Sequence, residues 1–200
     1  SLEGHAAEVL SIAWRPDGEV LASLGRDGEV RLWKSDGTPQ AHFQANNERL
    51  SGIVFRPDGQ RLTVIGSRVQ IWTLDGQLER TIEVHGLANF RWSPDGERFA
   101  CTGTQKGNGL CSWKGDGTGK NAPLPQVRDI RCLDWSPNSR DLTFGTKEGV
   151  VYHWDMDANM AKWVAIRFND GTHVTFTPAG QIIDGDRQRL MHQLVYVVER

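Results

Sequence analysis

Histidines and carboxylates are the side chains of this 200-residue chain that could perform acid–base or metal chemistry. The acidic run from Asp155 to Asn159 lacks the glycine and the final glutamate of a calcium-binding loop. The chain also lacks the nucleophile-elbow, zinc-protease and phosphate-loop motifs. These patterns predict no catalytic residue, no bound metal and no cofactor, so we expect that the protein is not an enzyme. The six histidines are scattered, at His5, His42, His85, His153, His173 and His192.

A second group of residues is cationic and recurs at expected turns between the second and third strands of successive sheets. Because Arg binds carboxylates and phosphates in a bidentate geometry, these cations predict a positively charged rim that receives an acidic or phosphorylated peptide. Acidic neighbours such as Asp27 and Glu148 would cancel part of this field, so simply solvated turns are the alternative. The candidate rim residues are Arg26, Arg68, Lys106, Lys147, Arg187 and Arg189.

The elements that must position these residues repeat along the chain. An aromatic residue, Arg or Ser, Pro, Asp or Asn, and Gly or Ser follow one another four times, and a weaker fifth copy contains Pro178. A second aromatic marker keeps the same period of about 40 residues. Two independent markers with one period predict a repeat architecture. The four prolines are Pro16, Pro57, Pro94 and Pro137, and the second markers are Trp33, Trp72, Trp113, Trp154 and Tyr196.

Each repeat has the pattern of four short antiparallel strands. Pro fixes φ at the second position of a turn and Gly accepts a positive φ after it, so each Pro-Asp-Gly phrase predicts a tight turn. In the first repeat, 19–24 and 29–33 are the expected second and third strands. Sheets with apolar side chains on both faces must stack on one another. We therefore predict an all-β propeller of about five four-stranded blades, with almost no helix.

Four residues of the first repeat resemble the hydrogen-bonding residues of the WD-repeat family. They are His5, which follows Gly4, then Ser23 in the second strand, Asp27 in the next turn and Trp33 at the end of the third strand. The resemblance implies a β-propeller in which His5, Ser23, Asp27 and Trp33 form a structural tetrad. The later repeats lack parts of this set, so we expect a full tetrad in the first blade alone. The anchoring aromatics of the other blades are Trp72, Trp113, Trp154 and Tyr196.

The repeats predict a single propeller domain over residues 1–200. Either the five blades close into a small ring or they belong to a larger one, which we favour because the chain starts within a motif. The plain Pro-Asp-Gly repeats also look similar to the C-terminal propellers of bacterial multi-domain signalling proteins. The expected blades cover approximately 4–45, 46–84, 85–123, 124–168 and 169–200, with residues 1–3 completing the last one.

Such a disc without catalytic groups predicts a non-catalytic scaffold for protein–protein interaction. We expect a binding or regulatory module cut from a larger multi-domain protein. The alternative is a propeller that binds a small ligand or performs catalysis in its central channel, although inner strand ends such as Val9-Leu10 and Ile130-Arg131 offer no catalytic set. An open ring would expose an apolar blade face, and the chain would then self-associate.

Charge and composition bear on partners and location. A net charge of −2 and a pI near 6.3 give no global attraction to nucleic acid or to an anionic membrane. The longest apolar run, 194–198, is far too short to span a bilayer. We expect Cys101, Cys111 and Cys132 to be small buried hydrophobes in a reducing compartment. Because we also find no signal segment, we expect a cytoplasmic protein.

Overall fold

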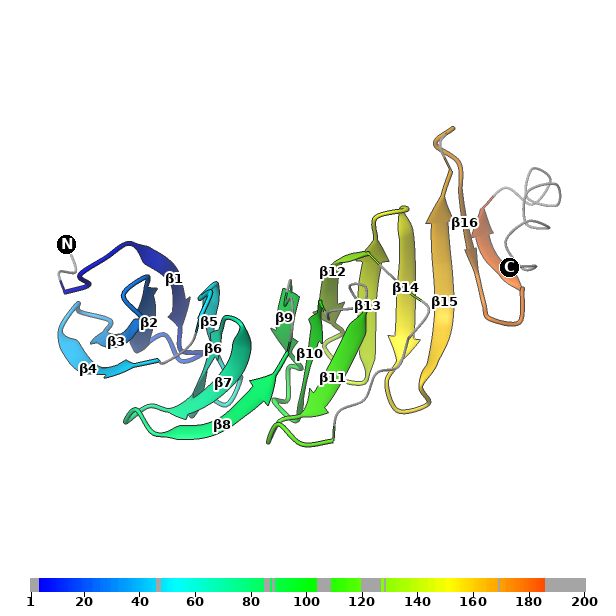
Figure 1. Ribbon diagram of the computed structural model, residues 1–200. Coiled ribbons are helices and arrows are strands. Elements are labelled where there is room, and N and C mark those ends of the chain that lie inside the picture. Colours follow the sequence, from blue (N-terminus) through cyan, green and yellow to red (C-terminus); the bar gives the residue numbers. More distant parts are fainter. Residues whose placement is uncertain are drawn as a thin grey trace.

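The chain forms four antiparallel β-sheets that stand side by side in a curved row (Figure 1). The computed structural model describes residues 4–45, 48–84, 87, 89–103, 109–119, 127, 129–168 and 170–185. Within these ranges every regular element is a strand, which confirms the predicted all-β fold of antiparallel sheets. No helix in the described part of the chain is long and apolar enough to cross a membrane.

The first two sheets each contain four strands in sequence order, as expected for propeller blades. The strands of the first sheet are β1 (Val9–Trp14), β2 (Val20–Gly25), β3 (Glu29–Lys34) and β4 (Pro39–Gln44). The strands of the second sheet are β5 (Gly52–Phe55), β6 (Arg61–Ile65), β7 (Arg68–Thr73) and β8 (Leu78–Glu83).

The fourth sheet departs from the predicted four strands per blade, whereas the segment expected to hold the last strand of the third sheet lies mostly outside the described residues. The third has three strands among the described residues, and the fourth has six. The strands of the third sheet are β9 (Asn89–Trp92), β10 (Arg98–Thr102) and β11 (Leu110–Lys114). Those of the fourth are β12 (Ile130–Trp135), β13 (Asp141–Thr146), β14 (Val150–Asp155), β15 (Met160–Arg167), β16 (His173–Phe176) and β17 (Ile182–Gly185).

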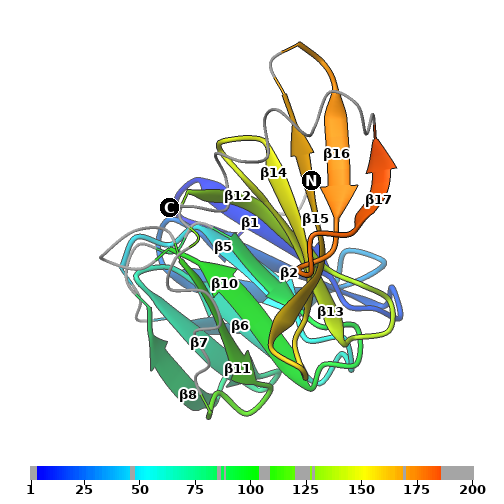
Figure 2. The same cartoon turned by 90° about the vertical axis from the view of Figure 1, so that its right-hand side faces the viewer.

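The six-stranded sheet joins segments that the sequence assigned to the fourth and fifth blades. Strand β15 is eight residues long, and its second edge pairs with β16, where Val164 lies opposite Phe176. Strands β15 to β17 consequently project from the end of the row (Figure 2). The pairing with β16 satisfies the N–H and C=O groups that the second edge of β15 would otherwise expose.

The repeated turn phrase closes the first two strands of each of the four sheets. Gly18, Gly59 and Gly96 adopt φ values of 76°, 68° and 72°, which a side chain would strain. The fourth copy carries Ser139 at φ 59° instead. Its Oγ accepts a hydrogen bond of 3.0 Å from the backbone N–H of Asp95 in the third sheet. The serine thus adds a bond between neighbouring sheets at a position where glycine would add none.

Apolar side chains fill the space between consecutive sheets. One buried cluster joins the first and second sheets, and it includes Leu24, Leu32, Leu62 and Trp72. Two further clusters continue the core, one between the second and third sheets and one between the third and fourth. The stacking of sheets, not the interior of any single sheet, therefore makes the hydrophobic core.

Indole N–H groups also connect the sheets. Trp92 at the end of β9 donates to Thr63 Oγ1 of the second sheet at 3.0 Å. Trp135 at the end of β12 donates to the carbonyl oxygen of Arg91 in the third sheet at 3.2 Å. Because these groups are buried or partly buried, each bond satisfies a donor that would otherwise lose its water partner. The first aromatic of the repeat therefore links each of these sheets to the one before it.

The expectation that all three cysteines are buried is wrong for one of them. Cys101 and Cys111 are buried and lie opposite each other in β10 and β11. Cys132 is exposed, because it lies on the face of β12 opposite to that of the buried Leu133.

We predict that Thr63→Val lowers the free energy of unfolding by about 1–3 kcal/mol, because it leaves the buried indole N–H of Trp92 without an acceptor. Urea denaturation measures this loss. Repeating the substitution in a Trp92→Phe background is the control, since no donor remains there and the cost of Thr63→Val should shrink. An equal cost in both backgrounds would contradict the assigned bond.

Candidate functional site

The structure brings the four residues of the proposed tetrad together across the first sheet. Trp33 Nε1 donates to Ser23 Oγ at 2.9 Å, and Ser23 Oγ lies 2.7 Å from His5 Nε2. His5 Nδ1 lies 3.4 Å from Asp27 Oδ1. Since the Ser23 oxygen accepts the indole proton, its own hydroxyl proton is available for His5 Nε2. A chain of hydrogen bonds therefore runs from β3 through β2 to the turn before β3.

Asp27 fixes the entry of the chain into the first sheet. Burial by itself would raise the pKa of the Asp27 carboxyl, but bonds from the backbone N–H groups of Glu29 and Ala6 and from the His5 ring outweigh it. The pKa of this carboxyl is therefore lowered from its ordinary value near 3.8. The ionised form is the one that these donors stabilise.

The same corner holds the residues that come nearest to a metal-binding group in the described part of the chain. Ligand atoms of His5, Asp27 and Glu29 all lie within 4.8 Å of one another. His5 and Asp27 are already bound within the network described above. Glu29 binds Arg31 at 2.9 Å and His42 at 2.7 Å, so all three side chains already have protein partners. The geometry therefore assigns these side chains to a hydrogen-bonded structural network.

The anchoring aromatics of the later sheets have different surroundings. Trp72 and Trp154 are buried, and their indole Nε1 atoms have no hydrogen-bond partner. Phe43 stacks on Trp72 with ring centroids 4.9 Å apart, and Phe99 stacks on Trp113 at 5.2 Å. Tyr196 lies outside the described residues. Trp72 and Trp154 therefore act through apolar contact, whereas Trp33 also closes a polar network.

Sequence reasoning missed a second polar network, in the fourth sheet. Asp141 is 4% exposed and accepts bonds from Lys162 Nζ at 2.6 Å and from Asn138 at 3.1 Å. His153 Nδ1 lies 2.9 Å from Thr143 Oγ1, and its Nε2 lies 3.5 Å from Asp141. Burial would raise the pKa of Asp141, but the Lys162 and Asn138 donors lower it overall. The sequence did contain a signal for this network. Asp141 stands at the start of the second strand, where the other repeats have a non-acidic residue.

The cations of the predicted rim lie in varied settings. Arg26 forms an ion pair of 2.8 Å with Glu8, and Arg68 forms one of 3.1 Å with Glu83. Lys147 is exposed in the turn between β13 and β14. Acidic partners thus offset two of the described cations, and the rim stays a prediction. Lys106, Arg187 and Arg189 lie outside the described residues.

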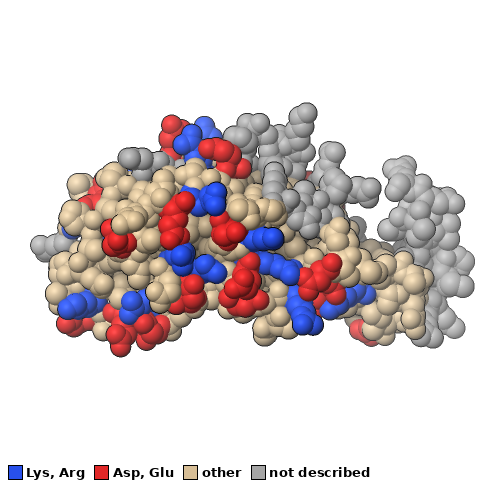
Figure 3. Space-filling view, turned by 90° about the horizontal axis from the view of Figure 1, so that it is seen from below, with Lys and Arg blue, Asp and Glu red and all other residues tan. Residues whose placement is uncertain are grey.

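The surface seen from below is similarly mixed in charge. Figure 3 shows Lys and Arg interspersed with Asp and Glu over the described part of this face. The described part of this face therefore favours no partner of one sign, and recognition of charge there depends on individual sites.

One apolar surface is open, on β1 of the first sheet. Ile12 and Trp14 are 62% and 52% exposed, and they share one face of the strand because they are two residues apart. The residues that match Trp14 in the other repeats are 7–9% exposed: Phe55, Trp92 and Trp135. Each of those three is covered by the preceding sheet, whereas no described residue covers Trp14 in this way.

We predict that Ser23→Ala lowers the free energy of unfolding by about 1–3 kcal/mol, because it removes the partner of both Trp33 Nε1 and His5 Nε2. Chemical denaturation tests this. Ser35→Ala, at an exposed turn position, is the matched control and should change the stability little. A similar loss in both variants would show that the hydroxyl of Ser23 is not special.

The lowered pKa of Asp27 predicts a pH dependence. A carboxyl whose pKa is lower in the folded than in the unfolded state stabilises the fold above its unfolded pKa, and this stabilisation is lost as the pH falls through the folded pKa. We expect Asp27→Asn to flatten the fall in unfolding free energy between about pH 5 and pH 2. Denaturation series at several pH values measure the slope, and parallel curves for wild type and variant would contradict the assignment.

The comparisons with known proteins agree with this geometry. Residues 1–34 and 125–155 match the family described as WD domain, G-beta repeat. The chain is 27% identical over 200 residues to WD repeat-containing protein slp1 of Schizosaccharomyces pombe, covering 91% of this chain and 38% of that protein. It is 32% identical over 193 residues to Protein HIR1 of Mycosarcoma maydis, covering 90% of this chain and 17% of that protein.

A third relative is the Small ribosomal subunit protein RACK1 of Schizosaccharomyces pombe, which is 29% identical over 107 residues, with 47% of this chain and 34% of that protein covered. The chain thus spans well under half the length of each of these eukaryotic relatives. The matched segments, the sheets and the tetrad geometry together support the assignment of this chain to the WD40-repeat family.

Proposed function

We propose that this chain is a non-catalytic scaffold for protein–protein interaction and that it binds another β-sheet through the open face of β1. The observation that carries the proposal is the exposure of Ile12 and Trp14 at positions whose counterparts are buried. Exposed aromatic residues on a rigid surface are typical of the centres of protein interfaces. The WD-repeat relatives support the general role of a regulatory or binding scaffold.

The packing of this chain against itself indicates what the face would bind. Trp92 enters the second sheet with its ring in the apolar cluster and its N–H on Thr63. A partner for Trp14 would therefore be a sheet face that is apolar and offers a hydroxyl or carbonyl acceptor.

A second copy of this chain offers a hydroxyl at the equivalent position, on a face that is polar near Asp141 and His153. Thr143 follows Pro137 by six residues, just as Thr63 follows Pro57. Its strand β13 belongs to the fourth sheet, at the other end of the row from β1 (Figure 1). Thr143 lies opposite His153 of β14, on the face that alternates with the buried Leu142 and Phe144. The first sheet of one copy and the fourth sheet of another thus form a head-to-tail pair.

The finer features of the function are part of the same proposal. An acidic or phosphorylated partner at the rim, a cytoplasmic location and a place within a bacterial signalling protein are expectations from sequence. The rim would act at the opposite end of the sheets from the Pro-Asp-Gly turns, so it and the β1 face are separate surfaces.

We expect the purified chain to self-associate with rising concentration, and Ile12→Ser combined with Trp14→Ser to weaken that association at least about tenfold, because interface aromatics commonly contribute 2 kcal/mol or more. Sedimentation velocity over a concentration series measures this.

Leu78→Ser is the matched control, since Leu78 is 46% exposed on β8, away from the β1 face. It should leave the association unchanged. A chain that is monomeric at every concentration, or a double variant that associates like wild type, would contradict the proposed role of the β1 face.

A further inference from the structure

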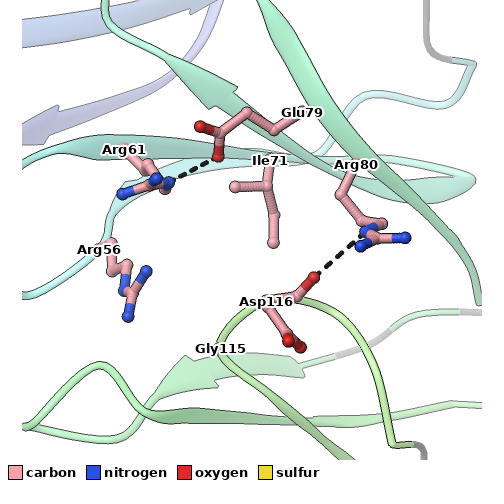
Figure 4. A pocket seen from close by; sticks show the side chains of 7 residues that line it. All are labelled: Arg56, Arg61, Ile71, Glu79, Arg80, Gly115 and Asp116. Carbon is pink, nitrogen blue, oxygen red and sulfur yellow. Dashed lines mark hydrogen bonds and ion pairs between the residues drawn. The ribbon is translucent and has the colours of Figure 1, made fainter.

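A small cavity between the second and third sheets is rich in arginine. Its volume is about 180 Å³. It lies at the end of the sheets that carries the Pro-Asp-Gly turns, because it gathers residues from the end of β5, the starts of β6 and β8 and the turn after β11. Its lining residues are Arg56, Arg61, Ile71, Glu79, Arg80, Gly115 and Asp116. Figure 4 shows Arg56 and Arg61 on one side, Arg80 on the other and Ile71 between them.

Both carboxylates of the cavity are already engaged. Glu79 Oε2 accepts a bond of 2.6 Å from Arg61 Nε. Asp116 Oδ1 accepts bonds from the backbone N–H and the hydroxyl of Thr118, at 2.8 and 2.7 Å, so this carboxylate closes its own turn. Neither carboxylate is hydrogen-bonded to Arg56 or to Arg80.

Arg56 is the least satisfied of the three cations. Its side chain is 17% exposed, and its buried Nε atom has no hydrogen-bond partner. The nearest carboxylate oxygen, Asp58 Oδ2, is 3.4 Å from Nε and forms only an ion pair. The guanidinium carbon lies 5.5 Å from the centre of the Trp92 ring. The aromatic face of Trp92 thus holds the charge in place without using its N–H donors.

The equivalent residue of the first repeat shows that this state is particular to Arg56. Arg15 also precedes the turn proline, but it binds Asp17 through two nitrogens, with Nε to Oδ1 at 2.9 Å and Nη2 to Oδ2 at 2.8 Å. The same motif position therefore carries a cation that is hydrogen-bonded to its aspartate in the first sheet and one that forms only an ion pair with its aspartate in the second. Arg80 adds further unused donors, because only its Nε is bonded, to the Asp116 carbonyl at 3.2 Å.

We infer that this cavity binds an oxyanion, and specifically the phosphoryl group of a phosphorylated side chain on a partner peptide. Guanidinium groups approach the cavity from two sides, and a phosphoryl group offers three acceptor oxygens to such donors. The volume accommodates one such group. The inference rests on the proposed function as a protein-interaction scaffold, and it names a partner chemistry at a site separate from the β1 face and from the predicted rim.

The test is a titration of the ¹⁵N-labelled chain followed by the arginine Nε–H signals. The probes are a short Gly-Ala peptide with one phosphoserine, the same peptide with Ser or with Glu, and inorganic phosphate. We expect saturable shifts of the Arg56 and Arg80 signals with the phosphopeptide, competition by inorganic phosphate and no saturation with the Ser peptide. Arg80→Gln should weaken binding roughly tenfold, because it removes charge-assisted hydrogen bonds.

Arg80 is exposed, so its substitution should leave the fold intact, and Arg15→Gln is the matched control that should leave phosphopeptide binding unchanged. Absence of saturation, or equal weakening by Arg80→Gln and Arg15→Gln, would overturn the site. Equal affinity for the Glu peptide would overturn the phosphoryl assignment. Sedimentation of the same samples distinguishes failure of this inference from failure of the proposed function. If the chain associates through the β1 face but does not bind the phosphopeptide, only the inference about the cavity is overturned.

Discussion

The structure depends on one constraint, which is that a sheet with apolar side chains on both faces must be covered on both. Side chains alternate along a strand, so a sheet whose strands are buried on both sides cannot be stable in water by itself. In this chain the second sheet sends Leu62 and Trp72 toward the first sheet and Val69 and Ile71 toward the third. Stability therefore resides between sheets, and a change at one interface affects two blades.

Apolar contact alone would allow neighbouring sheets to slide, and directional bonds prevent it. The indoles of Trp92 and Trp135 each reach an acceptor on the preceding sheet, and the Ser139 hydroxyl accepts an N–H from the third. Hydrogen bonds have narrow geometric requirements, so each one fixes a register that hydrophobic burial leaves open. The His5–Ser23–Trp33 network has a different role, because it lies within the first sheet and holds the incoming chain against it.

The repeat made the strands and turns predictable because proline, glycine and aromatic spacing act locally. The strand pairings of the first two sheets follow from that period, whereas the meeting of His5, Ser23 and Trp33 was implied by the resemblance to the WD-repeat family. The union of β15 with β16 was not predictable, since the repeat pattern does not specify which neighbouring edge the weak fifth repeat pairs with. The network around Asp141 was also missed, because a carboxylate at the start of a strand looks like a solvated surface residue until Lys162 is placed beside it.

The arginine before the turn proline shows why a repeat does not fix chemistry. Arg15 and Arg56 occupy the same position of the same phrase, and both are followed two residues later by an aspartate. Arg56 nevertheless keeps only an ion pair with its aspartate and lies over Trp92, because the third sheet presents an aromatic face to it. A repeat sequence specifies the backbone of each blade. Contacts with the neighbouring blade determine whether a side chain forms structural bonds or has donors available to bind a ligand. Functional sites in such a fold are therefore expected where two consecutive repeats differ, and the boundary between the second and third sheets is one of those places.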